Sequence, residues 1–525
     1  MPTIPTVARP EQHNLSSTNP LRSLCQPFAC GLIPILLFAI TAIAPSESIA
    51  ENNRIVAENQ RTGTTDWQLT RVRPNAGRYR TSLVEGYCSE QSLAVGEELK
   101  VFISSDPAVP VNLDIYRMGY YGGTGGRLVK TLSNIDTITQ PVPDAGKDRV
   151  RQCKWEPSVS FTIPEDWVSG VYLGKLTTVP EADQPYWQSY VIFIVKDDRP
   201  ADFVFQCSDN TWQAYNRWPV NDSLYTHPDG PQKPGVAVSF DRPYGMYCQI
   251  FEHPLSLGSG EFLLWEFPLC FWMEQQGYDV TYVSNSDLLN PGEIDRCKTF
   301  LSVGHDEYWD TRQYDTVAAA IDRGVNVLWL SANSVYMVSP FSPSESGQPN
   351  RIITRTGSFG PLREEETQTY GKIMGPFETH GPDERKIIGA RTVVPFNGGG
   401  DWVCTQPKHW IYEGTQMRRG DRIEGLIGWE HHGDPDLQRP GLQVVAEGTT
   451  WAGGTNPGHW TATIFPGPKG NFVFNAATIY WAQGLATPPG HIIPWSHYSR
   501  PHGPDRRVQQ ITKNLFERSL QKTQD

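Results

Sequence analysis

The residues best suited to chemistry lie in one short segment near the middle of the chain. Residues 304–309 read Gly-His-Asp-Glu-Tyr-Trp, which places an imidazole, two carboxylates, a phenol and an indole in consecutive positions. The apolar run at residues 300–303 is typical of a buried strand. His305 and Glu307 therefore follow the end of a predicted strand, where they could bind a metal or transfer protons.

Two tyrosines are further candidates. Tyr215 and Tyr225 lie in a stretch at residues 211–225 that is dense in phenols, indoles and amides, and this stretch is predicted as a long loop after a strand at residues 203–205. A tyrosine in such a loop could bind a metal through its oxygen. The alternative interpretation is a packed ring with one hydrogen-bonded hydroxyl.

Three polar residues elsewhere are also candidates. Asn333 follows an apolar run at residues 325–330, and Glu430 follows one at residues 426–428. Their structural alternatives are a helix cap for Asn333 and an arginine ion pair for Glu430. Arg242 is predicted as a structural ion-pair partner, with substrate contact as the alternative.

The elements around residues 304–309 form a predicted βαβ unit. Apolar positions with helical spacing at residues 311–323 connect two predicted strands, and Gly324 marks the end of the helix. In a doubly wound sheet, ligands bind beyond the carboxyl ends of the strands. His305, Glu307 and Asn333 all lie at such ends. The flanking elements, a helix at residues 262–276 and a strand at residues 278–283, extend the unit.

The chain divides into four predicted parts. Residues 67–198 contain short alternating segments separated by Gly, Pro and Asp, which is typical of an immunoglobulin-like β-sandwich. Residues 199–525 form the doubly wound α/β domain, with β-rich insertions. Residues 1–50 read as a signal peptide and residues 51–66 as a flexible lead-in. The sandwich strands are expected at residues 99–103, 111–116, 158–163, 170–176 and 190–195.

The N-terminal segment predicts an exported protein. Basic residues precede an apolar run at residues 31–44 that is shorter than the ~20 residues of a spanning helix. The small-x-small sequence at residues 48–50 fits a cleavage site. An uncleaved anchor is the alternative, and it would be the protein's only membrane contact.

Composition bounds the partners and the redox chemistry. The formal net charge is −12 and there is no basic tract, which argues against a nucleic-acid partner. Of nine cysteines, Cys25 and Cys30 precede the apolar run, and the remaining seven contain no Cys-x-x-Cys pair, which excludes a zinc ribbon. Export permits disulfides, and Cys88 with Cys153 is one plausible pair.

Several common catalytic signatures are absent. The sequence has no Gly-x-Ser-x-Gly elbow, no Gly-x-Gly-x-x-Gly after a strand and no Walker motif. The pair His305 and Glu307 has the spacing of zinc deaminases, but their Pro-Cys-x-x-Cys half is missing. A two-carboxylate glycosidase stays open, although nothing singles out a pair of acids.

Five segments together resemble the large (beta) subunit of N,N-dimethylformamidase, above all its C-terminal domain. The Gly-His-x-Glu-Tyr-Trp segment is the most specific of them. The resemblance spans roughly residues 200–515 and implies an amidotransferase-like form of the α/β domain. The segments lie at residues 211–216, 277–282, 304–309, 331–334 and 428–430.

The resemblance implies a mononuclear iron site held by two tyrosines and one glutamate. By position the glutamate is Glu307 and one tyrosine is Tyr215. The second is Tyr225, with Tyr244 as the next choice. His305, Asn333 and Glu430 match polar residues around that metal.

This ligand set is chemically reasonable. A free phenol has a pKa near ~10, so a strong Lewis acid is needed to keep it ionised at neutral pH. Two phenolates and one carboxylate balance the charge of a trivalent ion, which lowers the free-energy cost of burying the site.

The resulting hypothesis is an exported, iron-dependent hydrolase of C–N bonds in small amides. It would act as a homo-oligomer or with a small partner subunit, since the family enzyme has one. A non-catalytic envelope protein that binds glycan or a partner is the alternative. A weaker option is a glycan hydrolase or lyase that uses Glu307 and Glu430.

Overall fold

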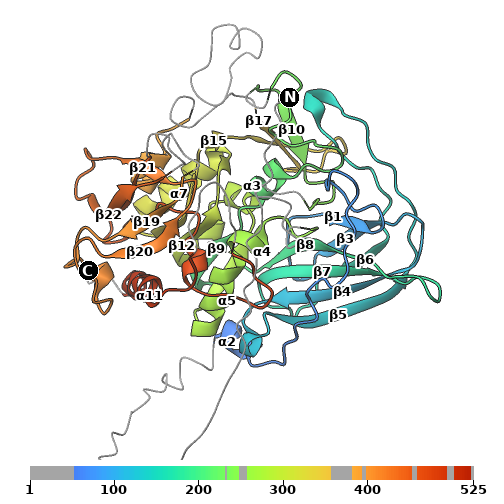
Figure 1. Ribbon diagram of the computed structural model, residues 1–525, viewed down its shortest axis with the longest axis horizontal. Coiled ribbons are helices and arrows are strands. Elements are labelled where there is room, and N and C mark those ends of the chain that lie inside the picture. Colours follow the sequence, from blue (N-terminus) through green and yellow to red (C-terminus); the bar gives the residue numbers. More distant parts are fainter. Residues whose placement is uncertain are drawn as a thin grey trace, which may run out of the picture. The chain divides into compact units, whose positions relative to one another are not determined.

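The structure is a computed structural model (Figure 1). All the described residues belong to one compact unit, Ser48–Asp525. The predicted signal peptide lies outside them, so export stays a prediction. None of the described helices has the length and apolar character needed to cross a membrane. The structure describes residues 53–230, 233–246, 257–355, 381–392, 398–451, 458–493 and 502–521.

A seven-stranded sheet organises the C-terminal part. Five parallel strands stand in the order β11-β9-β12-β14-β24, and the antiparallel strands β23 and β22 extend one edge. Numbered along the chain, the parallel strands have the order 2-1-3-4-5 of a doubly wound sheet. The bounds are β9 Ala201–Gln206, β11 Val280–Val283, β12 Cys297–His305, β14 Asn326–Ala332, β22 Gln443–Thr449, β23 His459–Pro466 and β24 Phe472–Asn475.

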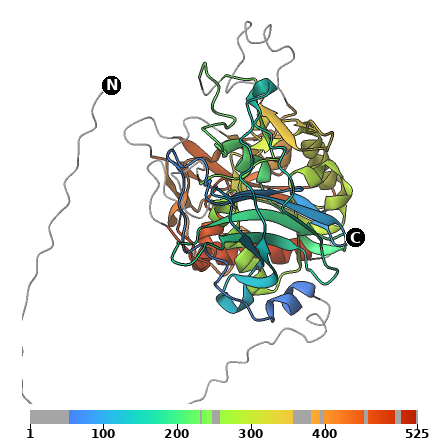
Figure 2. The same cartoon turned by 90° about the vertical axis from the view of Figure 1, so that its right-hand side faces the viewer.

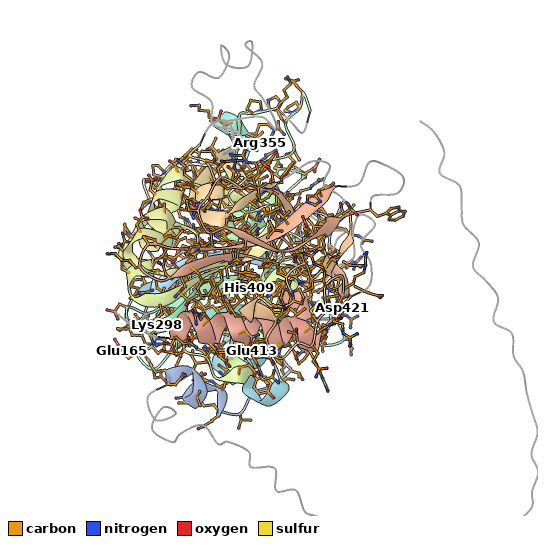
Figure 3. The ribbon with its side chains drawn as sticks, turned by 90° about the vertical axis from the view of Figure 1, so that its left-hand side faces the viewer. Glu165, Lys298, Arg355, His409, Glu413 and Asp421 are labelled. Atoms are coloured by element: carbon orange, nitrogen blue, oxygen red, sulfur yellow. The ribbon has the colours of Figure 1, made fainter. Side chains whose placement is uncertain are left out.

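Helices cover both faces of this sheet. Helix α7 (Thr311–Arg323) packs on one face in a core with Phe300. Helices α5 (Phe267–Gln276) and α11 (Arg506–Leu520) share the other core with Leu301, the next residue along β12. Both sides of the strand are thus apolar, as expected for a buried parallel sheet. Helix α11 faces the viewer in Figure 3, beside Glu413, whose carbonyl accepts from Asn514 Nδ2 at 2.8 Å.

Helix α7 shows how the local sequence sets where a helix begins and ends. Asp310 and Gln313 form a capping box at its start, and Gly324 ends it in the left-handed region with φ 107°. The helix predicted at residues 311–323 is therefore confirmed. The helix predicted at residues 262–276 is present as two pieces, α4 (Phe262–Trp265) and α5, which meet at Glu266.

The N-terminal part is a two-sheet structure, visible in Figure 2. A three-stranded sheet, β1-β3-β6, packs on a five-stranded sheet, β2-β8-β7-β4-β5. The five predicted strands are present, and the sequence reading missed β1, β2 and β5. The bounds are β1 Glu85–Cys88, β2 Ser92–Ala94, β3 Glu98–Ser104, β4 Val111–Met118, β5 Gly126–Ile135, β6 Val159–Thr162, β7 Gly170–Thr178 and β8 Gln188–Lys196.

Smaller elements surround the central sheet and supply the predicted β-rich insertions. The remaining strands are β10 Val236–Ser239, β13 Tyr308–Trp309, β15 Met337–Val338, β16 Phe341–Ser342, β17 Ile352–Arg355, β18 Ala390–Thr392, β19 Gly400–Val403, β20 Arg422–Ile427 and β21 His432–Pro435. The remaining α-helices of the described residues are α2 Arg54–Asn59, α3 Asp209–Tyr215, α6 Gly292–Asp295 and α10 Arg385–Ile388.

Two sequence interpretations were wrong. Residues 209–215 form helix α3 and not a loop, because burial of almost the whole segment overrides its weak local helix signal. Cys88 and Cys153 are both free and buried, so the suggested disulfide is not formed.

A buried ion pair joins the two parts of the chain. Arg117 in β4 binds Glu274 in α5 through two hydrogen bonds of 2.8 and 2.9 Å, and both side chains are fully buried. Asn59 and Tyr282 also donate to this carboxylate, at 2.7 and 3.1 Å. A Cβ on Gly119 would lie 2.3 Å from the same carboxylate, which explains a glycine in this turn. The turn therefore has a structural role.

We expect the substitution Arg117→Met to lower the free energy of unfolding by about 3–5 kcal/mol, because it leaves a buried carboxylate without its cation. Denaturant titration measures this. The matched control is Lys100→Met, whose exposed pair with Glu98 spans 3.9 Å and should contribute less than ~1 kcal/mol. Equal losses in the two variants would contradict a special role for the buried pair.

Candidate metal centre

The site begins where strand β12 ends. Gly304 adopts φ 70°, in the left-handed region, one residue before the strand ends at His305, and the chain leaves the sheet at residues 306–307. A Cβ at this position would lie 2.6 Å from Trp265 Cβ, closer than packing allows. Position 304 therefore requires glycine for its backbone angle and for the close approach of helix α4.

Helix α3 and strand β15 hold the backbone of Glu307 in place. The Glu307 backbone N–H donates to Thr211 Oγ1 at 2.9 Å, and its carbonyl accepts from Met337 N at 2.9 Å. The loop that leads from β14 to β15 contains Asn333 and Val335 at φ 49° and 54°. Left-handed angles at residues other than glycine cost about 1–3 kcal/mol each and often occur at functional sites.

Three oxygen donors converge beside this turn. The Tyr215 hydroxyl donates to Glu307 Oε2 at 2.7 Å, and the Tyr225 hydroxyl lies 3.2 and 3.3 Å from the two Glu307 oxygens. The two hydroxyls are 2.7 Å apart. Helix α3 presents Tyr215, and the segment after it presents Tyr225.

The imidazole of His305 lies between the carboxylates of Glu307 and Glu430. His305 Nε2 is 2.6 Å from Glu430 Oε2 and 3.3 Å from Glu307 Oε2. Asn333 Nδ2 lies 3.4 Å from the same nitrogen, and Thr392 donates to Asn333 Oδ1 at 2.8 Å. Although burial lowers the pKa of His305, the two carboxylates raise it to about 10. The imidazole is therefore a cation between the two acids at neutral pH.

Burial controls the protonation of the oxygen donors. It raises the pKa of Tyr215 and Tyr225 well above the usual range of a phenol, and the Glu307 carboxylate raises both further. Burial also raises the pKa of Glu307, against the hydrogen bond from His305. Without a nearby cation the two phenols stay protonated. A metal ion bound beside them would stabilise their ionised, phenolate form.

The donor set fits a small, hard cation. Metal–oxygen bonds of about 2.0–2.2 Å place adjacent ligand atoms roughly 3 Å apart, which is close to the spacing of the three oxygens here. Phenolate and carboxylate oxygens suit a highly charged ion. A second donor set overlaps the first: one ligand atom each from His305, Glu307 and Glu430 lie within 4.8 Å of one another.

The six predicted site residues are brought together by the structure. They come from the last residue of β12 and from the segments after β9, β12, β14 and β20, which meet at the carboxyl edge of the sheet or beside it. They are Tyr215, Tyr225, His305, Glu307, Asn333 and Glu430.

For three residues the structure differs from an alternative that the sequence analysis had left open. Tyr244 packs beside Trp212, with ring centroids 6.5 Å apart, and lines a separate cavity with residues of the β-sandwich. The next element after Asn333 is strand β15, so Asn333 does not cap a helix. Glu430 forms an ion pair with His305, whereas the structural alternative named an arginine.

Arg242 has a structural role. Its buried guanidinium donates to the carbonyls of Trp218 and Asp222 at 2.8 and 2.7 Å and to Gln213 Oε1 at 2.8 Å. It thereby holds the segment that carries Tyr225. Backbone carbonyls take the place of the predicted ion-pair partner.

Sequence reasoning missed three residues of the site. The Tyr308 hydroxyl donates to Tyr225, the Arg355 guanidinium lies 5.8 Å from the Tyr225 ring centroid, and Thr392 orients Asn333. Tyr308 directly follows Glu307, so its position in the motif was a usable signal. Arg355 and Thr392 lie in segments with no such signal.

Comparison with known families decides the relationship. Residues 112–498 match the family described as N,N-dimethylformamidase beta subunit-like, C-terminal. The chain belongs to this family. The match begins in β4 and therefore includes much of the β-sandwich as well as the α/β part. No curated protein matches the chain significantly.

We expect Gly304→Ala to lower the free energy of unfolding by about 2–5 kcal/mol, the sum of left-handed strain of about 1–2 kcal/mol and overpacking of about 1–3 kcal/mol. Gly420→Ala is the control, since Gly420 has φ 88° but no atom within 4 Å of an added Cβ. It should show the strain alone. Denaturant titration of both variants measures the difference, and equal losses would contradict the close approach at Trp265.

Proposed function

We propose that this protein is an iron-dependent hydrolase of the C–N bond in small amides. The observation that carries the proposal is the convergence of Tyr215 and Tyr225 on Glu307 in a buried site. Membership of the N,N-dimethylformamidase-like family supports the reaction class. The proposal also includes an immunoglobulin-like form of the β-sandwich and an amidotransferase-like form of the α/β domain.

Tyr215, Tyr225 and Glu307 would hold the iron. When bound, the ion supplies Lewis acidity, which lowers the pKa of a water molecule and polarises an amide carbonyl. Two phenolates and one carboxylate carry three negative charges, so a ferric ion would leave the buried site close to neutral. That balance favours a trivalent ion, such as ferric iron, over a divalent ion at this position.

His305 and Glu430 form the proton-handling pair. Their separation of 2.6 Å allows a proton to pass between Glu430 Oε2 and His305 Nε2. Because His305 is already protonated at neutral pH, the Glu430 carboxylate would be the general base that takes the proton of the attacking water, and the pair would return that proton to the leaving amine. Asn333, oriented by Thr392, provides an amide that can orient substrate or water beside His305.

The arrangement of the acids bears on the glycan-hydrolase option. Glu307 and Glu430 both contact the same His305 nitrogen. Carboxylates that flank a glycosidic bond instead face each other across space for a sugar. The shared imidazole therefore favours metal binding and proton transfer.

Export and assembly complete the proposal. We propose that residues 1–50 direct the protein out of the cytoplasm. The family description refers to a beta subunit, so we also propose a small partner subunit or a homo-oligomer. N-terminal sequencing of the protein recovered from cells tests whether residues 1–50 are removed on export. The mass of the native protein in solution tests the assembly.

We expect the wild-type protein to bind one iron per chain and to show a visible tyrosinate-to-iron band. Tyr215→Phe should lose or shift this band and lower iron content, because it removes one oxygen donor. Metal analysis and absorption spectroscopy measure both. Tyr244→Phe is the matched control and should leave the band unchanged.

Two results would contradict the proposal. A colourless wild-type protein that stays metal-free after incubation with ferrous or ferric iron would reject the iron site. Loss of the band in Tyr244→Phe together with its retention in Tyr225→Phe would reject the choice of the second tyrosine.

A further inference from the structure

Tyr308 is a phenol of the site to which the proposed function assigns no role. Its side chain is completely buried, and its hydroxyl donates to the Tyr225 hydroxyl. Tyr225 and Tyr215 in turn reach the Glu307 carboxylate. Within the described residues Tyr308 has no hydrogen bond to Glu307. It is therefore one step further from the proposed metal than the other two phenols.

The three aromatic rings have a fixed arrangement. The rings of Tyr215 and Tyr225 stack, with centroids 4.8 Å apart and an interplanar angle of 24°. The Tyr308 ring meets both from the side, at 6.2 Å and 79° from Tyr215 and at 6.4 Å and 90° from Tyr225. Edge-to-face contacts of this kind are favourable, so Tyr308 limits how far the stacked pair can rotate.

The backbone of Tyr308 is itself fixed. Strand β13 pairs with β15 through Tyr308 and Met337, and Asn210 Nδ2 donates to the Tyr308 carbonyl at 3.0 Å. The Arg355 guanidinium lies 5.8 Å from the centroid of the Tyr225 ring. Arg355 is labelled in Figure 3, at the opposite end of that view from helix α11. Tyr225 is thus held at its hydroxyl by a rigid partner and has a cation beside its ring.

We propose that Tyr308 is a positioning residue for Tyr225. Its hydrogen bond keeps the Tyr225 oxygen against Glu307 and, resting on the proposed function, reduces the electron donation of that oxygen to a bound metal. A hydrogen bond donated to an anionic oxygen stabilises the negative charge on it. Substitution of a residue that orients a metal ligand in this way typically lowers metal affinity by about 10–100-fold.

The test compares iron-loaded Tyr308→Phe with wild type. We expect one iron per chain at saturation, an iron affinity lower by about 10–100-fold, and a tyrosinate-to-iron band at longer wavelength because Tyr225 becomes a stronger donor. Tyr412→Phe is the matched control: Tyr412 is buried and donates to the Val445 carbonyl at 2.7 Å, away from the site. It should leave band and affinity unchanged.

Two spectroscopic outcomes overturn the inference. An unchanged band together with unchanged affinity shows that the hydrogen bond does not act on Tyr225. Loss of iron and colour to the same extent as in Tyr225→Phe shows that Tyr308 is itself a ligand.

A second readout does not depend on iron. In a crystal structure of metal-free Tyr308→Phe we expect the Tyr225 hydroxyl to move away from Glu307. Unchanged distances of 3.2 and 3.3 Å to the Glu307 oxygens overturn the inference. Wild-type protein that binds no iron rejects the proposed function, and this crystal structure then decides the role of Tyr308 by itself.

Discussion

The cost of burying the Glu307 carboxylate determines the arrangement of the site. A carboxylate removed from water must be protonated, paired or hydrogen-bonded. Here His305 and the hydroxyls of Tyr215 and Tyr225 surround it. Since His305 also contacts Glu430, the charges of two acids and one imidazole depend on one another. A cation among the phenol oxygens would complete this set, and the donors already converge on one point.

The fold contributes the precision of that arrangement. The parallel strands β12 and β14 end beside each other. Left-handed backbone angles occur at Gly304, the last residue but one of β12, and at Asn333, the residue after β14. Helix α3 and strand β15 hydrogen-bond to the backbone of Glu307, so regular elements fix the position of the carboxylate. Sites built on rigid elements keep their geometry better than sites on loops.

The β-sandwich is integrated with this scaffold. One face of its five-stranded sheet belongs to the same apolar core as helix α5 and the central sheet, and the Arg117–Glu274 pair crosses between the two parts. The family match, which begins at residue 112 inside β4, also crosses the predicted boundary near residue 199. We therefore regard the sandwich as part of the structural unit that supports the site.

The sequence alone determined the βαβ unit around residues 304–309 and the bounds of α7, because strand periodicity and helix caps are local signals. It also indicated the carboxyl edge as the place of the site. Tertiary structure decided that Tyr225 and not Tyr244 faces Glu307, that Glu430 pairs with His305, and that Tyr308 completes the cluster. Tyr215 and Glu307 are 92 residues apart, and a contact at that separation depends on strand order and packing, which no local pattern encodes.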